Sequence, residues 1–151
     1  MSRIYTVPFD NLSVTNDSDQ DIFEMVGAAG YPFALVAFEL YSSITTDERV
    51  RLRLVRRSTT GSGGTGATEV RMDGGNTVSA QTAVSTLVTT PGTIGDIAHA
   101  WYWSQLAPLI YRPTPKEIVE AAGGGRLCLN LATAVASTRS WSGFVTWEEF
   151  G

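Results

Sequence analysis

The chain has 151 residues, of which 43% are hydrophobic and 17% are charged, and its formal net charge is −4. This length fits one domain with its own core, and the apolar content excludes an intrinsically disordered chain. Nucleic-acid binding is not expected, because phosphate contacts need a basic surface and the chain has no basic excess. The charged fraction is below the usual value of about 25%. Gly, Ser and Thr take its place, which favours strands and turns over exposed helices.

Cysteine content and hydrophobic runs indicate the compartment. Cys128 is the only cysteine, so no internal disulfide can form, which fits assembly in a reducing cytoplasm. The first residues lack the apolar segment of a signal peptide. The longest largely apolar run, residues 25–38, is shorter than the about 20 residues that a bilayer requires. We therefore expect neither secretion by this route nor contact with a membrane.

Four segments carry strand signals. Residues 33–40 are apolar almost throughout, which predicts a central strand covered on both faces. In three later segments apolar residues alternate with other residues, the period of a strand with one buried face. These are Val50, Leu52 and Leu54; Leu127, Leu129 and Leu131, with Cys128 and Asn130 opposite; and Trp141, Val145 and Trp147.

Turn signals separate these strands at fairly regular spacing. They lie at residues 16–19, 59–66, 73–76, 91–92 and 123–125, and the third contains Asp-Gly, which favours a hairpin turn. The pattern predicts an all-β, antiparallel β-sandwich of jelly-roll type, a single domain over residues 1–151 with at most one or two short helical turns. Residues 114–120 fit a helical turn, with Thr114 as N-cap and Pro115 next, as well as they fit a strand.

The glycine-rich segment 61–66 matches G-x-G-x-x-G. A dinucleotide site needs this motif between a strand and a helix, so that the pyrophosphate meets a helix N-terminus. The residues that follow, 67–72, alternate and end at Asp-Gly, so no helix fits there. We interpret the segment as a flexible inter-strand loop and predict no cofactor.

The sequence gives little support for a catalytic site or a metal site. His99 is the only histidine, so with Cys128 it cannot build a zinc site of the usual three or four ligands. A Cys128–His99 nucleophile pair is formally open, but both residues lie in strand-like segments, and no G-x-S-x-G elbow is present. We predict no catalytic residues and no metal ligands, and we keep a hydrolase that uses His99 as a minor hypothesis.

Residues 17–21 have the short calcium-binding pattern D-x-D-x-D. A full EF-hand loop also needs Gly at its sixth position and Glu at its twelfth, and these positions hold Ile22 and Ala28. We interpret the segment as a solvated turn, with a weak surface cation site as the alternative.

Two groups of side chains allow both a structural and a functional interpretation. Arg49, Arg51 and Arg53 form a basic row on one strand face, which is either solvated or a contact with an acidic partner, since arginine is enriched at interfaces. The second group is aromatic and is either core or a sugar-binding face. Its members are Trp101, Tyr102, Trp103, Tyr111, Trp141 and Trp147.

Several strings, in order along most of the chain, resemble a family of small structural proteins of tailed bacteriophages. They are residues 2–9 (SRIYTVPF), 51–53 with 59–64, 113–117 with 126–129, and 143–149 (GFVTWEE). The resemblance is to capsid decoration, or cement, proteins. It implies a jelly-roll or related β-sandwich without catalytic function, located on the capsid exterior of the virion and assembled in the host cytoplasm.

The resemblance also implies partners: the major capsid protein, and further copies of the chain in a homo-dimer or homo-trimer. The candidate contact residues are Arg49, Arg51, Arg53, Gly61, Gly63 and Gly64, with the glycine loop expected to become ordered on binding. The alternative function is a tail or fibre recognition module that binds a surface glycan through the aromatic residues.

Overall fold

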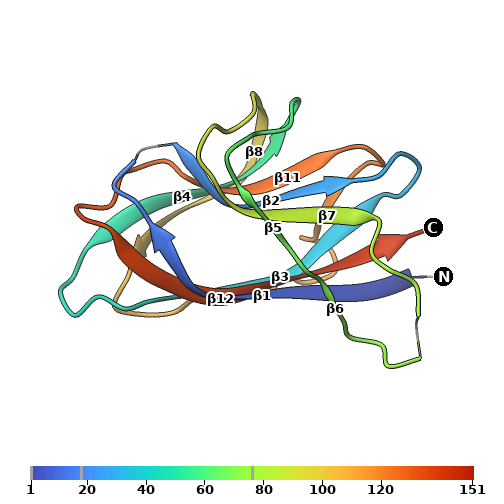
Figure 1. Cartoon of the computed structure of the whole chain (residues 1–151), viewed down its shortest axis with the longest axis horizontal. Coiled ribbons are helices and arrows are strands. Elements are labelled where there is room, and N and C mark those ends of the chain that lie inside the picture. Colours follow the sequence, from blue (N-terminus) through green and yellow to red (C-terminus); the bar gives the residue numbers. More distant parts are fainter. Residues whose placement is uncertain (1, 18, 76) are drawn as a thin grey trace.

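The computed structural model describes residues 2–17, 19–75 and 77–151. Within these residues the chain forms twelve β-strands and no helix. The strands make two antiparallel sheets that lie face to face, and both termini are at the same end of the sandwich (Figure 1). The predicted all-β sandwich is therefore confirmed. None of the described residues belongs to a helix long and apolar enough to span a membrane.

The strand order defines the two sheets. Sheet A has the order β10-β3-β12-β1-β6, with β9 also pairing with β3. Its strands are β1 (Ser2–Val14), β3 (Phe33–Ser42), β6 (Val70–Arg71), β9 (Leu109–Tyr111), β10 (Val119–Ala121) and β12 (Arg139–Phe150). Sheet B has the order β5-β7-β2-β11-β4-β8. Its strands are β2 (Gln20–Gly27), β4 (Arg49–Arg57), β5 (Thr65–Ala67), β7 (Thr82–Val88), β8 (Ile94–Ser104) and β11 (Arg126–Leu131).

The pairings are nested in the way that defines a jelly roll. β1 pairs with β12, β2 with β11, β3 with both β9 and β10, and β4 with β8, all antiparallel. The first four strands and the last five thus form one long ribbon, which wraps so that alternate pairs enter alternate sheets. The segment between β4 and β8 is an addition to this ribbon: β5 and β7 widen sheet B, and β6 widens sheet A (Figure 1).

The core lies between the sheets and follows the predicted alternation. Val50, Leu52 and Leu54 are at most 1% exposed, and the predicted leucines of β11 are fully buried. Residues 33–40 form the expected central strand, with β12 on one side and β9 and β10 on the other. Trp103, Trp141 and Trp147 are buried in this core, as expected for structural tryptophans.

Two turn predictions need correction or refinement. The Asp73-Gly74 segment does not close a hairpin, because β6 before it pairs with β1 of sheet A, while β7 after it lies in sheet B. The segment before the turn instead adds to the edge of β1, where Met72 N also donates to Ile4 O at 3.0 Å. Residues 114–117 form one turn, closed by Glu117 N to Thr114 O at 2.8 Å, after which the chain continues as strand β10.

Candidate functional site

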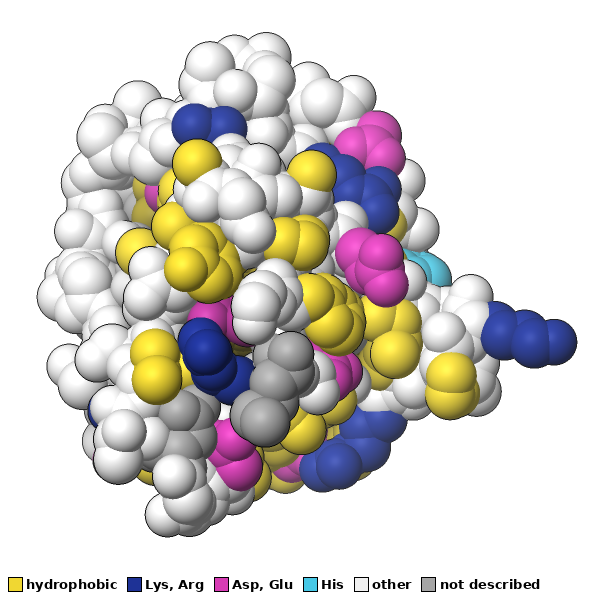
Figure 2. Space-filling view, turned by 90° about the vertical axis from the view of Figure 1, so that its right-hand side faces the viewer, with side chains coloured by type: hydrophobic (Ala, Val, Ile, Leu, Met, Phe, Trp, Pro, Cys, Tyr) yellow, Lys and Arg dark blue, Asp and Glu magenta, His cyan; other side chains and the backbone are white. Residues whose placement is uncertain are grey.

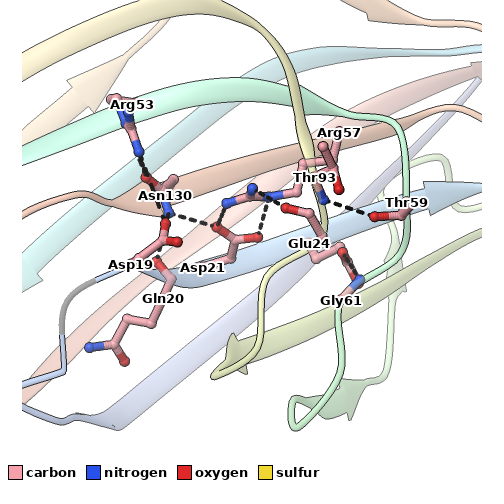
Figure 3. Close-up of polar contacts among 11 residues, drawn as sticks. Asp19, Gln20, Asp21, Glu24, Arg53, Arg57, Thr59, Gly61, Thr93 and Asn130 are labelled. Carbon is pink, nitrogen blue, oxygen red and sulfur yellow. Dashed lines mark hydrogen bonds and ion pairs between the residues drawn. The ribbon is translucent and has the colours of Figure 1, made fainter.

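The outer face of sheet B is divided into a covered part and an open part. Two loops, residues 58–64 and 89–93, fold over one end of the face (Figure 3). Their backbones are joined by Ser58 N to Thr93 O at 2.9 Å and by a two-bond bridge between Ser62 and Thr90. Side chains beneath these loops are shielded from water even though they do not belong to the core between the sheets.

A buried ion pair lies under this cover. The side chains of Arg57 and Asp21 are 1% and 0% exposed. Arg57 donates from Nε to Asp21 Oδ2 at 2.8 Å and from Nη2 to Oδ1 at 2.6 Å, and its Nη1 donates to Gly92 O. Burial raises the pKa of the Asp21 carboxyl, whereas Arg57 and Asn130 lower it. Burial also opposes the charge on Arg57, but Asp21 keeps the guanidinium pKa above its ordinary value.

Asn130 connects this pair to the predicted arginine row. Its Oδ1 accepts hydrogen bonds from Arg53 Nε at 3.1 Å and Nη2 at 2.7 Å, and its Nδ2 donates to Asp19 and Asp21, both at 3.0 Å. Arg53 is only 18% exposed as a result. Of the three arginines predicted as partner contacts, Arg53 is thus held within the protein.

The carboxylates of the D-x-D-x-D segment do not gather around one point. Asp21 is buried against Arg57, whereas Asp19 accepts from Asn130. Asp17 is exposed and accepts from the Thr15 hydroxyl at 2.8 Å. Asp19 and Asp21 share Asn130 as a donor, but Asp21 is also paired with Arg57, and the three carboxylates do not form a common cation site among the described residues.

A different trio, Asp21, Glu24 and Cys128, brings its ligand atoms within 4.8 Å of one another. Both Asp21 oxygens already accept from Arg57, and Glu24 Oε2 accepts from Gly61 N at 2.8 Å. A metal ion here would have to displace a guanidinium. Burial, together with Asp21 and Glu24, raises the pKa of the Cys128 thiol far above its ordinary value, so the thiol is a poor nucleophile. We interpret the trio as structural.

The predicted glycine contacts form the cover itself. A Cβ atom on Gly61 would lie 2.5 Å from Val88 Cγ1, and one on Gly64 would lie 2.8 Å from Val88 Cγ2. Gly63 has φ +80°, a backbone conformation that favours glycine. The glycines therefore serve close packing and one left-handed turn. Ordering of this loop on binding stays a prediction.

The open part of the face carries the other two predicted arginines. The Arg49 side chain is 69% exposed, with only a 3.9 Å contact to Asp47, and Arg51 is exposed opposite Tyr102 of β8. Tyr102 is itself 76% exposed. We call Arg49, Arg51 and Tyr102 the arginine–tyrosine face. Tyr102 was placed in the aromatic group from the sequence and was not predicted as a protein contact, although the period of two that turns its neighbours inward also turns Tyr102 outward.

His99 and Cys128 lie on opposite faces of sheet B. It pairs in register with the core residue Leu54, so it points to the inner side of sheet B, whereas Cys128 pairs with the outward Val55. The two side chains are on opposite faces, which excludes a Cys–His pair. His99 instead stacks on Trp101, with ring centroids 5.7 Å apart, and lies edge-on to Tyr111 at 5.6 Å.

Comparison with protein-family models, with curated proteins and with solved structures finds no match.

Proposed function

We propose that this chain is a non-enzymatic structural protein that binds the outside of a tailed-phage capsid shell and stabilises it by protein–protein contacts. The observation that carries the proposal is the arginine–tyrosine face. A tyrosine that is 76% exposed lies opposite one exposed arginine and close to another, on a regular two-strand surface.

The chemistry of this face suits protein binding. Tyrosine and arginine are enriched among the residues that dominate interface energies, because each combines a large apolar area with a polar end. Both arginines lack a close carboxylate partner among the described residues, apart from the 3.9 Å contact of Arg49 with Asp47. An acidic surface on the capsid protein would supply the missing charges.

The scaffold supports the same role. The buried Arg57–Asp21 pair and the loop cover fix β4 from its outer side, while the core fixes it from its inner side. A rigid strand pays little conformational entropy on binding. Jelly rolls occur in many viral proteins, which is an analogy at the level of fold.

The test is rebinding of purified protein to capsid shells that lack it, measured by co-sedimentation. We expect Tyr102→Ala and Arg51→Glu each to weaken binding at least about 30-fold, equivalent to about 2 kcal/mol for an interface hot spot. The matched control is Lys116→Glu, which makes the same charge reversal in the exposed turn between β9 and β10 and is expected to bind normally. Equal binding by all three variants would exclude this face as the contact.

A further inference from the structure

A hollow lies at the edge of the sandwich where β8 of sheet B and β9 of sheet A part. Its volume is about 280 Å³. The side chains that define its character are His99, Trp101, Ile110, Tyr111, Arg112 and Glu117. Three aromatic rings thus meet two charged groups in one small, open depression, on the opposite side of β8 from Tyr102.

Trp101 differs from the other three tryptophans of the chain. Trp103, Trp141 and Trp147 are at most 4% exposed, and each indole N–H donates a hydrogen bond within the protein. Trp101 is only partly buried, and within the described residues its indole N–H has no acceptor. Its ring is held in place by edge-on contacts with Phe38 at 5.7 Å and Tyr111 at 5.8 Å. It therefore offers a fixed apolar ring and an unused donor.

The polar groups around this ring also have hydrogen-bonding atoms without a partner among the described residues. Arg112 donates from Nη2 to Glu39 Oε1 at 2.5 Å, and its side chain is 64% exposed. Glu117 accepts at Oε2 from the Thr114 hydroxyl at 2.7 Å and from Thr114 N at 3.3 Å, while no described residue bonds its Oε1. His99 makes ring contacts only, within the described residues. Part of the single histidine is visible at the surface in Figure 2.

Charge and size restrict the ligand. Glu39 balances Arg112, so Glu117 leaves the hollow with a negative charge, and its Thr114 hydrogen bonds lower the Glu117 pKa and keep it ionised. An anionic ligand is therefore disfavoured. The volume is below the about 300–1,000 Å³ of sites for drug-sized ligands. The hollow therefore has room for one small ring.

We propose that this hollow binds a single neutral pyranose ring of a glycan. The apolar C–H face of the sugar packs against Trp101, and its hydroxyls bond to Arg112, Glu117 and His99, which together supply donors and an acceptor. A second hollow, of about 360 Å³ beside the start of β7, fits this role less well. The single charged side chain in its lining, Glu69, already accepts from Ala80 N at 3.1 Å.

The proposal is independent of capsid binding, and the test keeps the two apart. Methyl glycosides of glucose, galactose and mannose, with methyl glucuronide as the anionic comparison, are titrated against the folded protein. Binding is followed by the NMR shifts of the four indole N–H groups. We expect at least one neutral glycoside to bind in the millimolar range and to move the Trp101 signal most, with methyl glucuronide at least tenfold weaker.

Variants on the two sides of β8 provide the controls. Trp101→Ala is expected to abolish binding, and Glu117→Gln, an exposed position that leaves the core intact, to weaken it at least fivefold. Tyr102→Ala should bind sugar as the wild type does, while losing affinity for capsid shells. The proposal is overturned if no glycoside in the panel binds, if methyl glucuronide binds best, or if Glu117→Gln in its folded state binds unchanged.

Discussion

Removing one partner of the buried Arg57–Asp21 pair tests the structural interpretation of the covered face. Arg57→Met leaves the Asp21 carboxylate buried with only Asn130 as a donor among the hydrogen bonds described above. Asp21→Leu leaves the guanidinium with one remaining acceptor, Gly92 O. Both side chains are at most 1% exposed, so water cannot replace the lost partner without opening the loops.

The expected cost follows from this burial. Breaking a buried ion pair by removing one partner costs about 3–5 kcal/mol, because an uncompensated charge stays in a low-dielectric site. This is a large share of the roughly 5–15 kcal/mol that stabilises a typical domain. Replacing both partners removes the charge together with its counter-charge, so we expect the double variant to recover about 2–3 kcal/mol relative to the sum of the single variants.

Urea unfolding followed by circular dichroism measures these differences. With a slope of about 2 kcal/mol per molar urea, each single variant should lower the midpoint by roughly 1.5–2.5 M. The midpoint of the double variant should lie about 1–1.5 M urea above the value expected from adding the two single shifts. Single variants that each lose less than about 1 kcal/mol, or a double variant that equals their sum, would show that the pair does not support the covered face.

Three further results are expected. Cys128 should resist thiol reagents in the native protein because burial raises its pKa, and Gly61→Ala should speed its labelling by displacing the loop cover; equal rates would contradict the packing described for Gly61. The Glu39 pKa, measured by NMR, should be below its ordinary value because Tyr41 and Arg112 hydrogen-bond the carboxylate, and Tyr41→Phe should raise it. The stabilising effect of Glu39 is then present above the unfolded-state pKa and lost as pH falls through the lowered folded-state pKa. Acrylamide should quench one tryptophan, and Trp101→Phe should remove that quenchable signal, whereas uniform quenching would contradict the buried positions of the others.

The fold was predictable where a local pattern determines which face of a strand is buried. The alternation at residues 50–54 places leucines inward and arginines outward whatever strand lies beside them. The partial burial of one arginine was not predictable in this way. Arg51 and Arg53 look alike in the sequence, but Arg53 meets Asn130, which is 77 residues away in the chain. Local periodicity contains no information about such a partner.

The site residues show the same limit. The glycines at 61–64 suggested flexibility, yet their positions are explained by close packing against Val88, whose location depends on how β7 pairs. Trp101 and Trp103 have the same place in the alternation, but only Trp103 is buried. The difference arises because Trp101 lies at the open edge beside β9 and lines the hollow, a consequence of sheet order.

The most direct test of the proposed function is cryo-electron microscopy of the virion encoded by the genome that carries this gene. We expect symmetric copies of the jelly roll across boundaries between capsid subunits, with Arg49, Arg51 and Tyr102 turned toward the shell. Density for the chain only at the tail, or its absence from the particle, would contradict the proposal that it binds and stabilises the capsid.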